Sequence, residues 1–193
     1  MNELKHNKSS RLRRLLLLPV WFCLAGICCC YLCSMRKFIV DDTRYAKEIN
    51  AAAAKYGLDS RLVRALVYEE SRFRVDEVGG AGEIGLMQVI PSRAGADWAR
   101  ANHRSIPERS EFFDPEFNLE VGCWFLRDGM DRFKDYDHAA ELALARYNAG
   151  LTRAKKWAPQ DKKAPVIDNI DIASTRSYVS NIMERYQRYC EQK

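Results

Sequence analysis

The sequence contains no stretch in which apolar and polar residues alternate convincingly with a period of two, the pattern of half-buried β-strands. It also contains no internal repeat, which excludes a repeat architecture. The chain has 193 residues, 47% of them hydrophobic, which is enough to bury one sizeable core but not two full domains beside an appendage. We therefore expect one domain and one appended segment.

Basic residues are not in excess over most of the chain, although the formal net charge is +5. Residues 1–40 hold seven Lys and Arg against one acid, Glu3. The remaining residues hold 24 basic against 25 acidic side chains. Because the positive charge is confined to the N-terminus, nothing in residues 41–193 favours a nucleic-acid partner.

Residues 15–35 contain no charged side chain, and these 21 positions have about the length of a membrane-spanning helix. Five basic residues precede the run and only Arg36 and Lys37 follow it closely, so the positive-inside rule places the N-terminus in the cytoplasm. A cleaved signal peptide is the alternative, which the poor cleavage pattern disfavours. We predict a cytoplasmic N-terminus (1–14), a single-pass signal anchor (15–35), a connector (36–43) and an outer domain (44–193) on the extracytoplasmic side of the membrane.

Five of the seven cysteines lie inside this apolar run, where they are typical of small hydrophobes or lipidation sites and predict no metal site. The outer domain keeps only Cys123 and Cys190. A disulfide between these two residues is one possibility, and a free, buried thiol at Cys123 is the other.

The outer domain is predicted to be an all-α globule. Apolar periodicity and cap residues predict helices over residues 43–57, 60–73, from about 115, 138–148 and from about 174. The glycine-rich segment 76–91 and the segment 158–173 are expected to be loops. Ser92 is expected to cap a further helix, and Asp114 with Pro115 to open the helix that follows.

Glu70 lies near the middle of an apolar stripe on the second predicted helix, which Leu66 and Phe73 share. One interpretation is structural, with the carboxylate held in a core ion pair or a capping role. The other is that an apolar environment raises the pKa of the carboxyl and makes it a proton donor near neutral pH. The helix pattern alone favours the structural interpretation.

Glu70 is the first residue of the first of four ordered motifs. They are Glu70-Ser71-x-Phe73 followed by Gly82-x-x-Gly85-Leu86-Met87-Gln88 and Pro91; Asp114-Pro115-x-x-Asn118; Ala145-x-Tyr147-Asn148-Ala149-Gly150; and Thr175-Arg176-x-Tyr178-Val179. Over about residues 44–189 the chain resembles the catalytic domain of the soluble lytic transglycosylase (SLT) family, which shares its fold with goose-type lysozyme. The resemblance implies a lysozyme-like helical fold.

In that family the matching glutamate is the sole catalytic acid and base, which implies this role for Glu70. The implied reaction cleaves peptidoglycan between N-acetylmuramic acid and N-acetylglucosamine and forms 1,6-anhydromuramic acid, without a metal or a cofactor. The resemblance implies substrate contacts for Ser71, Met87, Gln88, Tyr147, Asn148 and Tyr178, and Glu83 is a further candidate for such a contact. Tyr147 resembles the family tyrosine whose hydroxyl approaches the catalytic carboxyl.

Several of these residues also have plain structural interpretations. Met87 and Tyr178 are equally suited to core packing, Asn148 to ending its helix, and Glu83 to solvent. Two positions depart from the family pattern, because Gly79 replaces a common serine and Ser174 a common glutamate. Glu83 replaces a common alanine and is a candidate to restore a second carboxylate near the cleft.

The implied partners are peptidoglycan glycan strands, the membrane through the N-terminal helix, and an unidentified envelope-assembly protein. Two other functions stay open. One is a hydrolytic muramidase or chitinase with the same fold, and the other is a non-catalytic peptidoglycan-binding scaffold that has lost activity through Gly79 and Ser174.

Overall fold

The computed structural model describes residues 40–192. The predicted N-terminus (1–14) and anchor (15–35) lie outside the described residues, as does most of the connector. The described part of the chain forms seven α-helices and no β-strand, with isolated bridges joining Val78 to Ile84 and Ile84 to Val89. The all-α prediction for the outer domain is confirmed.

Among residues 40–192 no helix is both long and apolar enough to cross a membrane.

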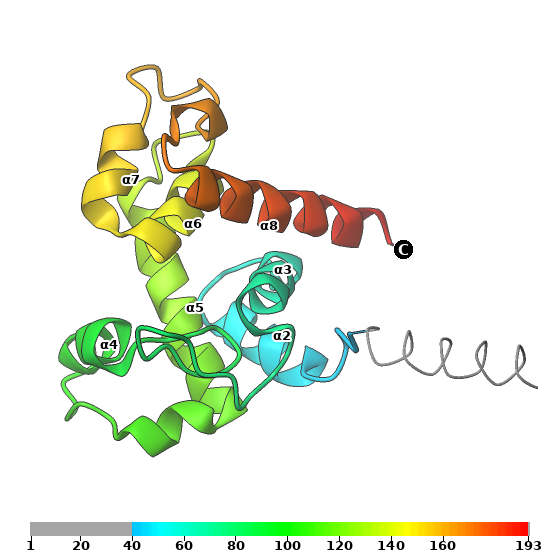
Figure 1. Cartoon of the computed structure of the whole chain (residues 1–193), viewed down its shortest axis with the longest axis vertical. Helices are drawn as coiled ribbons and strands as arrows, with labels where there is room; N and C mark the ends of the chain where they lie inside the picture. The colour runs from blue at the N-terminus through cyan, green and yellow to red at the C-terminus, as the bar shows by residue number, and fades with distance from the viewer. Residues whose placement is uncertain (1–39, 193) are drawn as a thin grey trace, which may run out of the picture. The chain divides into compact units, whose positions relative to one another are not determined.

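The helices follow the order that the sequence predicts (Figure 1). They are α2 (Ala46–Lys55), α3 (Ser60–Ser71), α4 (Ala96–Ala101), α5 (Pro115–Arg132), α6 (Ala139–Ala149), α7 (Leu151–Trp157) and α8 (Ala173–Glu191). A π-helical turn (Pro91–Gly95) precedes α4, and 3-10 turns occupy Arg109–Phe113 and Ile167–Asn169. The sequence had not predicted α7, which spans only two turns and lies directly after the Gly150 that ends α6.

Local side chains explain several helix ends. Asp59 accepts a hydrogen bond from the backbone N–H of Arg61 and caps α3, and Asp114 accepts one from Phe117 and caps α5 behind Pro115. The prediction that Ser92 is a cap is wrong. Pro91, with its fixed φ, opens the π-helical turn one residue earlier, so Ser92 lies inside that turn.

Helix α5 runs through the middle of the unit that begins at Asp41 (Figure 1). Helices α2 and α6 pack against α5, α3 packs against α2 and α8, and α6 also contacts α7 and α8. The apolar face of α3 is buried, since Leu62, Leu66 and Val67 are each at most 3% exposed. These contacts place α3 between α2 and α8.

The two cysteines of this unit do not pair. Cys123 is buried in α5 and Cys190 is exposed near the end of α8. The disulfide interpretation is therefore wrong, and the buried thiol at Cys123 is confirmed. Burial raises the pKa of this thiol far above its ordinary range, which keeps it protonated.

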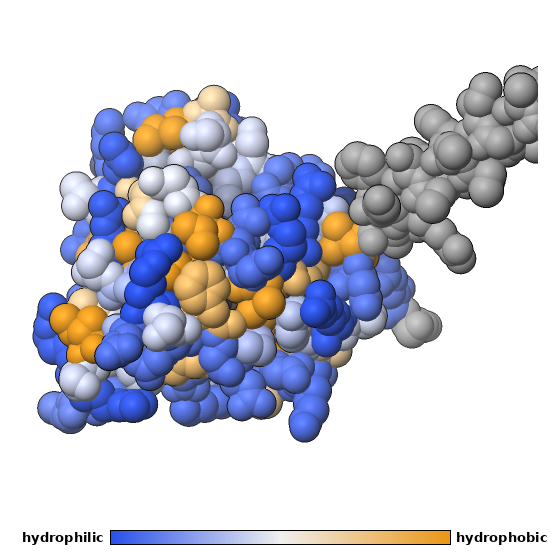
Figure 2. Space-filling view, turned by 60° about the horizontal axis from the view of Figure 1, so that its bottom comes forward, coloured by the Kyte–Doolittle hydropathy of each residue, from blue (hydrophilic) through white to orange (hydrophobic). Residues whose placement is uncertain are grey.

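The face drawn in Figure 2 is mostly hydrophilic, with hydrophobic residues showing in its middle. Among the described residues only Val78 and Ile106 are large hydrophobics with high exposure, at 48% and 62%. Val78 belongs to the loop between α3 and α4, which also carries the motif Gly82 to Gln88.

Asn118 of α5 holds this loop in place. Its Oδ1 accepts a hydrogen bond from the backbone N–H of Met87 at 2.8 Å, and its Nδ2 donates to the carbonyls of Ile84 and Phe112, both at 2.8 Å. Gly85 allows this close approach, because it has φ 76° and a Cβ there would lie 2.5 Å from Asn118 Nδ2. The buried amide therefore fixes the loop to the central helix.

We expect Asn118→Ala to lower the free energy of unfolding by about 3 kcal/mol, because three buried backbone groups lose their partner at once. Chemical denaturation of the full chain measures the change. Asn102→Ala is the matched control, since Asn102 makes one hydrogen bond, to the Trp98 carbonyl at the end of α4. Equal losses in the two variants would contradict this assignment.

Candidate active site

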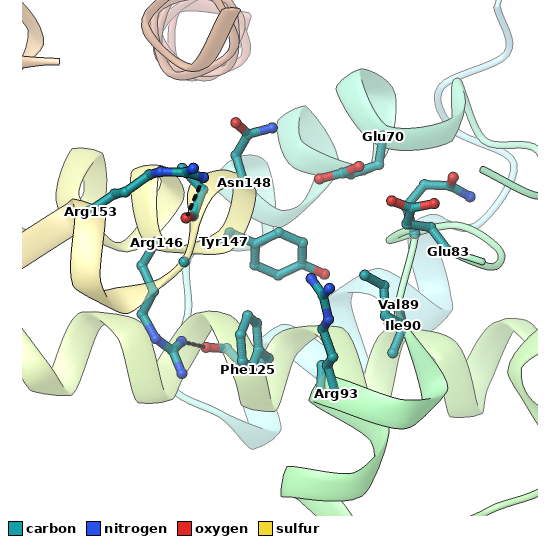
Figure 3. A pocket seen from close by; sticks show the side chains of 14 residues that line it. Glu70, Glu83, Val89, Ile90, Arg93, Phe125, Arg146, Tyr147, Asn148 and Arg153 are labelled. Carbon is teal, nitrogen blue, oxygen red and sulfur yellow. Dashed lines mark hydrogen bonds between the residues drawn. The ribbon is translucent and has the colours of Figure 1, made fainter. Parts of the chain in front are cut away.

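Glu70 lies in the last turn of α3, and its half-buried carboxylate lines a pocket of about 300 Å³ (Figure 3). Arg72 and Phe73 follow with φ values of 51° and 62°, so the chain turns sharply away from the helix. Four other predicted site residues line the same pocket: Glu83, Gln88, Tyr147 and Asn148. The structure thus brings together side chains from α3, the following loop and α6.

Tyr178 of α8 donates a hydrogen bond to Glu70 Oε1 at 2.5 Å. Tyr178 is only 9% exposed, and burial together with the charge of Glu70 raises its pKa well above 10. The hydroxyl therefore remains a donor over the physiological pH range. This contact fixes one oxygen of the carboxylate and leaves the other for a ligand in the pocket.

Burial raises the pKa of Glu70 from its ordinary value of 4.5 to about 7. The hydrogen bond from Tyr178 opposes this shift, because it stabilises the charged form, and the charges of Glu69 and Glu83 add to it. Near neutral pH both protonation states are accessible. A single carboxyl with this pKa is able to donate a proton and then to accept one.

Tyr147 and Tyr178 differ from the sequence-based expectation. Tyr147 lines the pocket, but its hydroxyl donates to the Met87 carbonyl at 2.8 Å rather than to Glu70. The reason is tertiary: α8, and not α6, packs along α3. The tyrosine bonded to the candidate acid is therefore Tyr178, and Tyr147 positions the loop.

Ser71 and Met87 do not reach the pocket with their side chains. Ser71 is 2% exposed and donates to the Leu86 carbonyl at 2.9 Å, and Met87 is 0% exposed. Neither side chain lines the pocket, so the structure gives neither of them a direct contact with a ligand there. Ser71 joins α3 to the loop, and Met87 fills the core beside Cys123.

Gln88 and Asn148 present polar atoms to the pocket. Gln88 adopts φ 46°, a costly left-handed conformation, and its Nε2 donates to the carbonyls of Gly85 at 3.0 Å and Glu77 at 3.2 Å. Asn148 is exposed and accepts a hydrogen bond from Thr175 Oγ1 at 2.7 Å, while Gly150 ends α6. Asn148 thus links α6 to α8 rather than capping its own helix.

Glu83 occupies the space above Gly79. Its Oε2 accepts a hydrogen bond from the backbone N–H of Ala81 at 2.8 Å. A Cβ built on Gly79 would lie 2.4 Å from this oxygen and 2.9 Å from Gln88 Oε1. The observed position of the Glu83 carboxylate therefore requires glycine at position 79. Ser174, the other departure from the family pattern, is exposed at the start of α8 and does not line the pocket.

Comparison with known proteins identifies the family of this chain. The family model described as the transglycosylase SLT domain matches residues 47–170, more than half of the chain. The chain belongs to the SLT transglycosylase family. The pocket with Glu70 lies within the matched residues.

Curated relatives of this SLT chain include two proteins of different origin. Membrane-bound lytic murein transglycosylase C of Shigella sonnei is 32% identical over 127 residues, covering 62% of this chain and 34% of that protein. The transglycosylase of Enterobacteria phage PRD1 is 33% identical over 126 residues, covering 64% and 42%. The chain thus spans between a third and a half of the length of these relatives.

Solved SLT structures share the fold. The lytic transglycosylase Slt of Pseudomonas aeruginosa matches with a TM-score of 0.67 and 25% identity, over 78% of this chain and 24% of that chain. The 70 kDa soluble lytic transglycosylase of Escherichia coli matches with a TM-score of 0.66 and 22% identity, over 78% and 25%. The expected lysozyme-like fold of the SLT family is confirmed.

Three arginines of the SLT domain line the pocket and had not been predicted: Arg93, Arg146 and Arg153. Arg146 lies within the Ala145 to Gly150 motif, and this position could have indicated that it is near the site. Arg93 and Arg153 belong to no motif. Figure 3 shows Arg146 and Arg153 on the side of the pocket opposite Glu70 and Glu83. Within residues 40–192 no cluster of His, Cys, Asp and Glu is arranged to hold a metal ion.

The raised pKa of Glu70 predicts a pH-dependent effect of Glu70→Gln on stability. The folded state keeps the Glu70 proton up to about pH 7, whereas the unfolded state loses it near 4.5, so stability falls as pH rises through this window. Glutamine has no charge to bury. We expect Glu70→Gln to stabilise the chain by about 3 kcal/mol at pH 8 and by almost nothing at pH 4.

Thermal unfolding of the full chain at the two pH values measures this difference. Glu184→Gln, which alters an exposed glutamate of α8, should show no such pH dependence. A stabilisation of Glu70→Gln that is the same at both pH values would refute a raised pKa.

Proposed function

We propose that this chain is a peptidoglycan lytic transglycosylase that cleaves between N-acetylmuramic acid and N-acetylglucosamine and forms 1,6-anhydromuramic acid. The observation that carries the proposal is the Glu70 carboxyl, which lines a pocket, accepts the Tyr178 hydrogen bond and has a pKa of about 7. Membership of the SLT family and the names of the curated relatives support it.

Glu70 acts twice in the proposed reaction. As an acid it gives its proton to the glycosidic oxygen, and the bond from that oxygen to C1 of the muramyl unit breaks. As a carboxylate it then takes the proton of the C6 hydroxyl of the same sugar, whose oxygen bonds to C1. The hydroxyl replaces water because it is held close to C1 within one molecule. Glu70 ends the cycle protonated.

Gln88, Asn148 and Glu83 are the proposed substrate contacts, since all three present polar atoms to the pocket. The Glu83 carboxylate takes the space that a serine side chain at position 79 would need. We assign to Glu83 the part of that serine, accepting a hydrogen bond from a sugar hydroxyl or acetamido N–H near the bond that breaks. Tyr147 acts indirectly, by holding the Met87 carbonyl.

The proposed cellular position follows from the N-terminal sequence. Residues 15–35 would anchor the chain in the inner membrane, with residues 1–14 in the cytoplasm and the SLT domain facing the peptidoglycan. The name of the Shigella sonnei relative, a membrane-bound enzyme, is consistent with an anchor.

A hydrolytic muramidase is the second candidate, and one observation favours it. Glu83 and Glu70 line the same pocket, and two carboxylates are what a hydrolytic glycosidase ordinarily uses. In that reaction water rather than the C6 hydroxyl would attack C1, and the product would have a reducing muramic acid end.

We expect the full chain to release anhydromuramic products from purified peptidoglycan, at a rate that falls as pH rises through about 7, because Glu70 then loses its proton. Glu70→Gln should lower this rate by about 10²- to 10⁴-fold. Mass spectrometry of the products measures both. Glu184→Gln is the control, and reducing ends without anhydro sugar would replace the transglycosylase proposal by the hydrolytic one.

The pairing of Gly79 with Glu83 makes a separate prediction. Gly79→Ser should lower turnover by about tenfold or more, because the new Cβ displaces the Glu83 carboxylate and the Gln88 amide. Glu83→Ala alone should also lower turnover, since the polar group is lost. The double variant should recover most of the activity, because loss of the Glu83 carboxylate removes the closer clash and leaves only the end of the flexible Gln88 side chain to adjust.

Gly80→Ser is the matched control, since a Cβ on Gly80 meets nothing within 4 Å. The same kinetic measurement on the parent chain, the two single variants and the double variant gives the coupling energy of the pair. Additive losses in the double variant would show that Glu83 does not take the place of a side chain at position 79.

A further inference from the structure

The charges of the pocket are separated. Glu70 and Glu83 lie on one side, and Arg146 and Arg153 on the other, while Arg93 points its guanidinium into the space between them (Figure 3). The three arginines come from three elements, the π-helical turn, α6 and α7. The acidic side is the proposed reaction centre, and the arginine side has no part in that chemistry.

Arg146 has a structural role. It is 6% exposed, donates to the Phe125 carbonyl at 2.7 Å and to Asp128 Oδ2 at 2.5 Å, and stacks over the Phe125 ring at 4.0 Å. Its guanidinium is paired with Asp128, which also pairs with Arg132. Arg146 therefore joins α6 to α5 behind the pocket surface.

Arg93 and Arg153 are different. Both are exposed, and within residues 40–192 neither has a carboxylate within 4.0 Å. Arg153 makes one hydrogen bond, to the Ala149 carbonyl at 3.5 Å, which leaves most of its donors available. Two guanidinium groups that line a pocket without an acidic partner favour an anionic ligand there.

The substrate itself supplies a suitable anion, and this step rests on the proposed function. The N-acetylated sugar rings are neutral, and the characteristic acidic group of the muramyl unit is its lactyl carboxylate. That group is either free or joined to a peptide stem that carries carboxylates of its own. A guanidinium binds such a group through two parallel hydrogen bonds.

We propose that Arg93 and Arg153 bind a carboxylate on the muramyl side chain, either the free lactyl group or a carboxylate of the peptide stem, and so select acidic muramyl glycans over neutral ones such as chitin. The contact lies away from the bond that breaks. It therefore strengthens ground-state and transition-state binding equally, and its loss raises KM with little effect on kcat.

Binding to the full chain with Glu70→Gln tests this without turnover. The ligands are GlcNAc–MurNAc tetrasaccharides in three forms: with the L-Ala–D-Glu stem, with the lactyl carboxylate free, and with that carboxylate converted to a methyl amide. We expect calorimetry to find the methyl amide form bound about tenfold more weakly than at least one acidic form. Preference for the stem or for the free lactyl group identifies the source of the carboxylate.

Adding Arg93→Gln and Arg153→Gln should abolish this preference, by weakening the acidic ligand about tenfold while leaving the methyl amide ligand unchanged. Lys155→Gln, which removes a cation from the same helix as Arg153 outside the pocket, should change neither. Higher salt should reduce the preference of the parent protein, because it screens exposed charges.

Two results would overturn the proposal: equal binding of acidic and methyl amide ligands by the parent protein, or equal weakening of both ligands in the arginine variant. Failure of the proposed function would give a different result from failure of the arginine proposal. The chain with Glu70 intact would then bind the acidic ligands selectively and yet release no cleavage product from peptidoglycan.

Discussion

The hydrogen bond from Tyr178 to Glu70 connects residues 108 positions apart and joins α8 to α3. It is one of three such contacts, because Tyr186 also binds Asp59 at 2.9 Å and Tyr189 binds Asp42 at 2.7 Å. Tyrosines of α8 thus meet carboxylates at both ends of α3 and before it. The same packing that holds α3 in the fold therefore fixes the direction of its terminal acid.

The loop after α3 depends on a second buried polar contact. Asn118 satisfies two backbone groups of the Gly82 to Gln88 motif and the Phe112 carbonyl, and Tyr147 satisfies the Met87 carbonyl. The loop has little regular structure of its own, so these side chains replace the hydrogen bonds that a strand would have supplied. The left-handed backbone conformation of Gln88 is energetically unfavourable, and the surrounding contacts hold the residue in it.

Charge explains the difference between the two sides of the pocket. Burial and the nearby acids raise the pKa of Glu70 to about 7, so this carboxyl is only partly charged near neutral pH. The arginine side lies against α6 and α7, and its exposed members keep their charge in contact with solvent. A pocket with these two sides accommodates a ligand that carries a hydrogen-bonding sugar at one end and an anionic substituent at the other.

The sequence by itself determined the helical class, most helix positions and the choice of Glu70 as the candidate acid. The predicted helices matching α2, α3, α6 and α8 agree with the structure to within three residues, because caps and apolar periodicity are local signals. The apolar stripe and the ordered motifs pointed to Glu70. Helix α7 was missed because two turns contain too little periodicity for a prediction.

Only the tertiary structure decided which neighbours serve the acid. Tyr147 and Tyr178 both belong to family motifs, and the packing of α8 on α3 chose Tyr178 as the partner of Glu70. Ser71 and Met87 turned out to be buried, while Glu83 took the space above Gly79. Arg93 and Arg153 had no sequence signal at all. Contacts between distant elements depend on the packing of side chains in three dimensions, which no local pattern of residues encodes.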